Sequence, residues 1–341
     1  MRRVLHLTGS PTDEEFADLS RLYAADCLRA VADPGRYEML IADVQPDGSW
    51  RFPASLEVAE LSGAPSLPIT EALIRINQWR PDVIVPQLFC PAGMTDYRSI
   101  PPLLGLPMIG NPAAVMALGA DKPAARAVVA EAGVSVPDGF VVRRDETLAA
   151  QDRWPVVVKP ASSDNSWGLS LVTSASGLPA ALERAWQWGD VALIEDFVPL
   201  GREVRCGILE RDGELVGLPL EEYAVDARTA PIRTAEDKLR RGGDGELELV
   251  AKQADRAWIV DPHDPVVGPV HDAARRAYRA LGCRQYGLFD FRIDPAGRPW
   301  FLEAGLYCSF APSSVIVTMA RAAGISVRDL FDECVSDAMD A

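Results

Sequence analysis

The N-terminal third of the chain alternates short apolar runs with longer segments of helical spacing. Apolar runs at residues 4–7, 37–44 and 83–86 predict strands, whereas residues 14–31 and 69–79 repeat their apolar positions every three or four residues and predict helices. This alternation predicts an open, mostly parallel sheet. Ligands of such sheets bind beyond the carboxyl ends of the strands. No glycine-rich dinucleotide or Walker A motif accompanies these elements.

The middle of the chain changes character. Asp121-Lys122-Pro123 predicts the start of a helix, because proline suits the first helical turn. In residues 155–172 two apolar runs flank a loop of small and polar residues, and Lys159 lies at the end of the first run. Backbone N–H groups and hydroxyls of such a loop could close over phosphates as a flap. A flexible hairpin of no special function is the alternative.

The last third predicts helices at residues 264–281 and 311–340, with a break near Gly324, and a hairpin between them. If Asp294 and Pro299 close a four-residue loop, Asp290 lies directly opposite Glu303. One face of this hairpin then carries Asp290, Arg292, Phe301 and Glu303, and the other, core face carries Phe289, Phe291, Ile293, Trp300 and Leu302.

Two carboxylates facing each other across a hairpin repel. A divalent cation between Asp290 and Glu303 would remove that repulsion, and hard oxygen ligands with water suit Mg²⁺. The alternative is a solvated strand face on which Arg292 neutralises both carboxylates.

Composition narrows the function classes. The net charge is −15, which argues against nucleic-acid and anionic-membrane partners, because both require basic surface. No apolar run is long enough to span a bilayer, and the start of the chain does not resemble a signal peptide. Six scattered cysteines fit a reducing cytoplasm, and three histidines make a His-based metal site improbable. We therefore expect a cytoplasmic protein.

Lysine is rare in this chain. Of 34 basic residues only four are lysines, namely Lys122, Lys159, Lys238 and Lys252. Because arginine is used wherever a surface cation suffices, the remaining lysines are candidates for positions that need a compact ammonium, such as a phosphate oxygen in a tight pocket. Chance retention is the alternative for any one of them.

These features in this order resemble the ATP-grasp superfamily, in particular D-alanine–D-alanine ligases, over nearly the whole chain. The motifs that carry the resemblance are Val158-Lys159-Pro160, the loop at 165–170, the strand at 193–195, Gly201-Arg202-Glu203 and the Asp290/Glu303 hairpin. The resemblance implies an ATP-grasp fold that combines α/β and α+β parts. An open parallel α/β domain would span 1–110, a small central α+β domain 111–197 and a C-terminal α+β domain 198–341.

The resemblance also implies roles for individual residues. ATP would bind to Lys122, Lys159, Asn165, Ser166, Gly168, Glu195, Asp196, Phe197, Val198, Glu203 and Lys238. Within this set the adenine-binding linker is Glu195 to Val198, the ribose acceptor is Glu203, and Ser166 on the flap and Lys238 on a polar loop at 237–245 are the catalytic candidates. Mg²⁺ would bind to Asp290 and Glu303.

The chain also departs from the D-alanine ligase pattern. Those ligases usually have arginine two residues before the metal aspartate, where this chain has Leu288. They usually have asparagine two residues after the metal glutamate, where this chain has Gly305, so a second Mg²⁺ loses an expected ligand. The acceptor loop at 87–95 is also rebuilt. The chain thus keeps the nucleotide-binding motifs and changes the acceptor side, which is the pattern expected of an enzyme that activates a different electrophile.

A narrower resemblance, carried by residues 218–223 and 301–310 among others, is to the D-Ala ligase-like enzymes of mycosporine-like amino acid biosynthesis. It implies that ATP activates the ring carbonyl of mycosporine-glycine and that serine or threonine is joined there, giving a UV-absorbing imine, ADP and phosphate. Ser313 and Ser314 would bind the amino acid's carboxylate, although Ser314 equally suits a helix N-cap. Glu14 and Glu15 are substrate candidates, but acids of a first helical turn are the favoured interpretation.

Two rival functions stay open at this point. One is a D-Ala–D-Ala or other carboxylate–amine ligase. The other is an inactive nucleotide-binding protein that kept the fold. The preferred amino acid and the number of Mg²⁺ ions are not fixed by the sequence, and a homodimer is implied only by resemblance.

Overall fold

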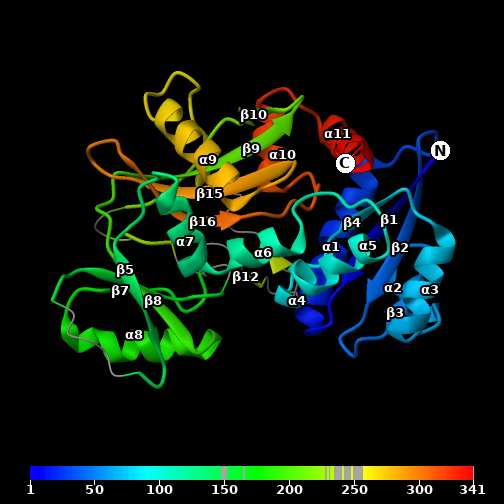
Figure 1. Ribbon diagram of the computed structural model, residues 1–341, viewed down its shortest axis with the longest axis horizontal. Coiled ribbons are helices and arrows are strands. Elements are labelled where there is room, and N and C mark those ends of the chain that lie inside the picture. Colours follow the sequence, from blue (N-terminus) through cyan, green and yellow to red (C-terminus); the bar gives the residue numbers. More distant parts are fainter. Residues whose placement is uncertain are drawn as a thin grey trace. The chain divides into compact units, whose positions relative to one another are not determined.

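The computed structural model describes residues 1–146, 152–163, 166–226, 229, 231–233, 240–241, 247–248 and 256–340. The chain forms two compact units. The first contains Met1–Ala117, Arg284–Tyr286 and Tyr307–Ala341, and the second contains Leu118–Cys283 and Gly287–Leu306. Helices combine with parallel and antiparallel sheets, so the expected mixture of α/β and α+β architecture is confirmed (Figure 1). The division into three domains at 110 and 197 stays a prediction.

The first unit is built on a four-stranded sheet of order β3-β2-β1-β4. Its strands are β1 (Arg2–Gly9), β2 (Tyr37–Val44), β3 (Trp50–Arg51) and β4 (Val83–Pro86). β1 pairs in parallel with both β2 and β4, as the alternating pattern predicted. The sequence at residues 106–110 also predicts a strand, but none is present there among the described residues, since Met108 makes only an isolated bridge to Ile84.

The long helices of the first unit lie in segments that the sequence predicted to be helical, whereas its short helices were not predicted. The long ones are α1 (Glu14–Val31), α3 (Ile69–Trp79), α10 (Val315–Ala322) and α11 (Val327–Asp340), and the short ones are α2 (Val58–Gly63), α4 (Pro91–Met94), η1 (Asp96–Ser99) and α5 (Ile100–Leu103). Helix α6 (Ala113–Ala120) runs from the first unit into the second. No helix in the described part of the chain is long and apolar enough to cross a membrane.

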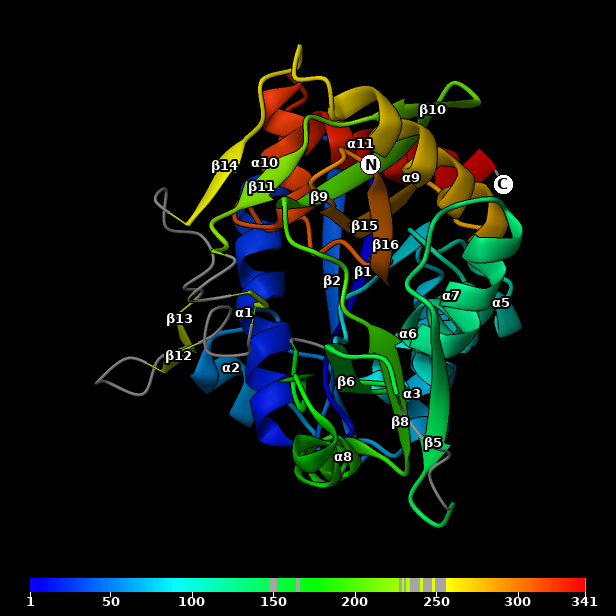
Figure 2. The ribbon, with the colours of Figure 1, turned by 90° about the vertical axis from the view of Figure 1, so that its left-hand side faces the viewer.

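The second unit contains an antiparallel sheet of order β5-β8-β6-β7. Its strands are β5 (Gly139–Arg143), β6 (Val156–Pro160), β7 (Ser170–Val172) and β8 (Val191–Asp196). Helix α8 (Leu178–Ala185) buries Leu178, Ala181, Leu182 and Ala185, one face of the helix, against the valines and isoleucine of these strands. Figure 2 shows α8 packed beneath β6 and β8. The opposite face of the sheet remains for polar side chains.

A larger sheet of order β14-β11-β9-β15-β16 completes the second unit, with β10 paired to β9. Its strands are β9 (Arg202–Arg211), β10 (Glu214–Gly217), β11 (Glu221–Tyr223), β14 (Ala257–Ile259), β15 (Tyr286–Ile293) and β16 (Pro299–Gly305). Helix α9 (Val267–Leu281), which ends at Gly282 in a left-handed conformation, packs on β9, and α7 (Lys122–Glu131) contacts β16. A separate short pair is formed by β12 (Arg240–Arg241) and β13 (Leu247–Glu248).

The β15–β16 hairpin confirms one part of the predicted register and corrects another. Asp290 does lie opposite Glu303. The turn, however, closes between Asp294 and Arg298, and a bulge after Asp290 restores the register. Phe301 is therefore paired with Phe291 and buried, and the predicted placement of Phe301 beside the carboxylates is wrong.

The bulge also moves the residues next to Phe301. Leu302 lines the pocket with the carboxylates instead of joining the core face. Trp300 is half-buried opposite Arg292 and donates its indole N–H to Asp294. Both were expected in the core, so this expectation is wrong as well.

Candidate active site

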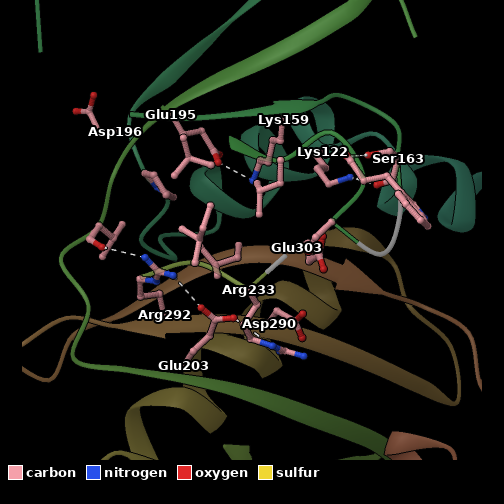
Figure 3. A pocket seen from close by; sticks show the side chains of 18 residues that line it. Lys122, Lys159, Ser163, Glu195, Asp196, Glu203, Arg233, Asp290, Arg292 and Glu303 are labelled. Carbon is pink, nitrogen blue, oxygen red and sulfur yellow. Dashed lines mark hydrogen bonds and ion pairs between the residues drawn. The ribbon is translucent and has the colours of Figure 1, made fainter. Parts of the chain in front are cut away.

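A pocket within the second unit brings together most of the residues expected to bind a nucleotide (Figure 3). Seven of them line it, namely Lys122, Lys159, Ser166, Glu195, Asp196, Val198 and Glu203, together with Asp290 and Glu303, which were expected to bind Mg²⁺. They come from helix α7, the flap and both sheets. Residues as far apart in the chain as Lys122 and Glu303 therefore meet in one place.

One wall of the pocket is the polar face of the β5–β8 sheet. Along β6, Val156 and Val158 point into the core under α8, so the alternation of the strand turns Val157 and Lys159 toward the pocket. The Lys159 ammonium pairs with the Glu195 carboxylate on β8 at 2.6 Å. Both side chains are buried, so each depends on the other as its partner out of water.

The flap is fixed at its base. Asp121 caps α7 by accepting from the backbone N–H of Ala124, which orients Lys122 toward the flap, where its ammonium donates to the carbonyl of Ser163. Ser166 and Gly168 both have positive φ. A Cβ on Gly168 would lie 2.8 Å from Pro160 Cγ, so only glycine fits there.

The opposite wall is the larger sheet. Glu203 on β9 accepts from Arg292 at 2.8 Å, and Arg233 lies 3.7 Å from its other oxygen. Arg233 is stacked on Tyr223, with its guanidinium carbon 3.5 Å from the ring centroid. Glu203 was expected to accept from ribose hydroxyls, and any such hydroxyl would have to share this carboxylate with two guanidinium groups.

The opposed carboxylates of Asp290 and Glu303 line the same pocket. Asp290 accepts two hydrogen bonds from the Arg205 guanidinium, one from Nε and one from Nη2, the latter at 2.6 Å. Burial alone would lower the pKa of Arg205, but the charge of Asp290, with smaller contributions from Tyr223 and Glu303, raises it well above its ordinary value. The alternative interpretation, in which Arg292 neutralises both carboxylates, is wrong in its choice of cation, because Arg292 pairs with Glu203 and Arg205 pairs with Asp290.

The remaining predicted residues fall elsewhere. Phe197 lies under the Arg292 guanidinium at 5.1 Å and is not among the residues that line the pocket. Asn165, Lys238, Lys252 and most of the 237–245 loop lie outside the described residues, so their roles stay predictions. Glu14, Glu15, Ser313 and Ser314 belong to the first unit.

In the first unit the substrate candidates stand at helix starts. Glu14 and Glu15 form the first turn of α1, which Asp13 caps, and Glu14 pairs with Arg21 at 3.4 Å. Ser314 occupies the N-cap position of α10, but its side chain makes no capping hydrogen bond. The Ser314 hydroxyl instead lies 3.9 Å from Cys308 Sγ.

Sequence reasoning missed Arg205 and Arg233. Arg205 stands two residues after Glu203 on β9, so strand alternation places both on the pocket face. That spacing could have identified Arg205. No local pattern distinguishes Arg233 from the other 29 arginines.

Comparison with known proteins gives a consistent result. Residues 129–336 match the family described as D-ala D-ala ligase C-terminus. A D-alanine–D-alanine ligase of Mycolicibacterium gilvum is 30% identical over 99% of this chain and 97% of its own. D-alanine–D-alanine ligase A of Mesorhizobium japonicum is 31% identical over the same shares.

Solved structures share the fold. The crystal structure of D-alanine–D-alanine ligase from Bacillus anthracis complexed with ATP superposes with a TM-score of 0.74 at 18% identity, covering 100% of this chain and 98% of that one. VanG D-Ala:D-Ser ligase from Enterococcus faecalis gives 0.76 at 20% identity over 99% of both chains. The expected ATP-grasp fold is thus confirmed, and with the match over most of its length the chain belongs to the D-alanine–D-alanine ligase family.

Proposed function

We propose that this protein is an ATP-dependent ligase that activates an electrophile by phosphoryl transfer and joins it to the amine of an amino acid, releasing ADP and phosphate. The observation that supports this most is the pocket itself. Two lysines on one wall face an opposed pair of carboxylates on the other (Figure 3). Compact cations for phosphates and oxygen ligands for a metal are the two requirements of phosphoryl transfer from ATP.

Each polar group has a role in this proposal. Lys122 and Lys159 hold phosphate oxygens, with Ser166 and Gly168 on the flap above them. Glu195 to Val198 bind the adenine, and Glu203 binds the ribose. Lys238 would approach the γ-phosphate. These groups position ATP and exclude water, which is most of what this chemistry asks of a protein.

The carboxylate pair fits Mg²⁺. Mg²⁺ is usually held by one or two carboxylates together with phosphates and water, rather than by an all-protein cage. Asp290 and Glu303 face each other, and the described residues contain no cluster of three or more acidic, histidine or cysteine ligands. When bound, Mg²⁺ would neutralise the phosphates and stabilise the charge that develops during transfer.

The leading candidate for the electrophile is an amino-acid carboxylate. The relatives that match along the whole chain are named D-alanine–D-alanine ligases, which favours this reading. The carboxylate would take the γ-phosphoryl group of ATP. The amine would then attack the acyl carbon, and the C–O bond to phosphate would break.

A second candidate is the ring carbonyl of mycosporine-glycine, with serine or threonine as the amine. Leu288, a largely buried side chain on β15, favours it, because it provides no cation for the oxyanion of an ordinary acyl-phosphate intermediate. Ser313 and Ser314 would bind the amino acid's carboxylate, and Glu14 or Glu15 its amine. The cytoplasmic location, the three-domain division and a homodimer are further parts of this proposal.

One panel of assays separates these candidates. The protein is incubated with ATP, Mg²⁺ and D-alanine, D-serine, L-serine or L-threonine, each with and without mycosporine-glycine, and products are identified by mass. A dipeptide with ADP would support the leading candidate, and an imine with red-shifted absorbance the second. AMP with pyrophosphate would refute the mechanism. ADP released by no substrate combination would favour an inactive nucleotide-binding protein.

A further inference from the structure

The Asp290 carboxylate is held by an arginine rather than left open to solvent. Arg205 approaches it side-on, and Nε and Nη2 each donate to a different oxygen. This fork uses one acceptor position on both oxygens, which is the strongest arrangement available to the two groups. A metal ion can use only the acceptor positions that remain.

Arg205 is fixed in this position by the sheet. Its guanidinium carbon lies 5.5 Å from the centre of the Tyr223 ring, and its side chain is only 17% exposed. Arginine stays protonated in proteins, and this one lies against one carboxylate of the opposed pair. A permanent positive charge is therefore built into the place where a cation is expected.

The rest of the hairpin offers few further ligands. Gly305, two residues beyond Glu303 on β16, has no side chain to contribute. Lack of room does not explain the glycine at position 305, because a Cβ there would lie 3.8 Å from Leu288 Cδ2, an ordinary contact. No third acidic, histidine or cysteine ligand joins the pair in the described part of the chain.

We propose that the Arg205 guanidinium takes the place of one divalent cation, so that the site binds a single Mg²⁺ with its nucleotide. The inference rests on the proposed function, since it concerns how this pocket neutralises ATP. A second ion on Asp290 would share its oxygens with the guanidinium and be repelled by it. Arg205 is thus a positioning residue that orients Asp290 and sets the cation count.

The test counts ions directly. Mn²⁺ replaces Mg²⁺, free Mn²⁺ is measured by electron paramagnetic resonance, and bound ADP is measured by equilibrium dialysis in the same samples. We expect one Mn²⁺ per bound ADP in the wild-type protein and in Arg205→Lys, which keeps the charge. Arg205→Gln is expected to bind two. The matched control is Arg202→Gln, on the same strand but paired with Glu222 and Asp264, which should keep one.

The outcomes are separable. Two Mn²⁺ in the wild-type protein would overturn the inference even if Arg205→Gln did not fold. One Mn²⁺ in a folded Arg205→Gln would also overturn it, because Arg205 would then not be what excludes the second ion. Absence of bound ADP in the wild-type protein would overturn the proposed function and this inference with it.

Discussion

At the scale of single residues, the site depends on charges that neutralise one another out of water. Lys159 and Glu195 form such a pair, as do Arg205 with Asp290 and Arg292 with Glu203. Removing one member leaves the other charged and buried, which costs more than the pair contributes. Each pair also holds a group in the place that the proposed reaction needs.

Glu195→Ala should therefore destabilise the second unit. Loss of the carboxylate leaves the buried Lys159 ammonium without this partner, and the expected cost is about 3 kcal/mol in the free energy of unfolding. Urea denaturation measures it. The control is Asp196→Asn on the same strand, whose ion pair with Arg153 is well exposed and is expected to contribute less than about 1 kcal/mol. Equal effects of the two changes would contradict this reading.

Glu303→Gln should abolish turnover while leaving the fold intact. The amide keeps the size of the side chain but removes the charge expected to hold Mg²⁺ opposite Asp290, and we expect the rate of ADP release to fall at least about a hundredfold. Circular dichroism checks the fold. Glu183→Gln on α8, an exposed position outside the pocket, is the control. A variant that retained normal turnover would refute the metal role of Glu303.

The residues of the site were only partly predictable from the sequence. Rarity identified Lys122 and Lys159, because four lysines among 34 basic residues stand out. It could not identify Arg205, since arginine is the ordinary cation of this chain. Its partner Asp290 is 85 positions away, and only the pairing of strands brings the two together.

At the scale of elements, the β15–β16 hairpin shows what periodicity can and cannot give. Counting back from the predicted turn placed Asp290 opposite Glu303 correctly, although the turn itself closes at Arg298. This count could not reveal the bulge that makes Leu302 an extra residue, because Leu302 and Phe301 are both apolar and either could face the core. Burial of the larger ring decides between them, and Phe301 then packs against Phe291 with ring centroids 6.1 Å apart.

This register predicts unequal costs for two neighbouring substitutions. Phe301→Ala removes a ring that is 2% exposed and should destabilise the protein by about 3–5 kcal/mol. Leu302→Ala, on the pocket side, should cost under about 1.5 kcal/mol and act on nucleotide affinity instead. Denaturation curves measure the free energy of unfolding of both variants, and equilibrium binding measures their affinity for ADP. If Leu302→Ala destabilised the protein more than Phe301→Ala, the result would contradict the bulge and support the register predicted without it.

At the scale of the whole molecule, most helices and strands could be placed from apolar spacing. The helix at 14–31, along which one buried face repeats, and the strand at 37–44, which ends in four consecutive buried residues, were placed at their observed bounds. The order of the strands in the larger sheet could not be predicted, since β9 and β15 are distant in sequence and their pairing depends on tertiary packing. The strand order was therefore missed because it depends on contacts between segments distant in the sequence. The ion pair of Arg205 with Asp290 was missed for the same reason.

One histidine should make the stability of the molecule depend on pH. His6 on β1 is fully buried against Phe331, and neither ring nitrogen has a hydrogen-bond partner among the described residues. Burial lowers its pKa from 6.5 to about 4, and the nearby Gln87 opposes this only in part. The unfolded chain therefore binds more protons than the folded one between these two values, and stability falls as the pH is lowered through that window.

The expected size of this effect is testable. Between about pH 7 and pH 5 the wild-type protein should lose about 2 kcal/mol of unfolding free energy through His6. His6→Leu, which fills a similar volume without ionising, should lose about 2 kcal/mol less over the same range. His263→Gln, at an exposed position, should behave as the wild type. Parallel pH dependence in all three proteins would show that His6 is not the group that couples protonation to folding.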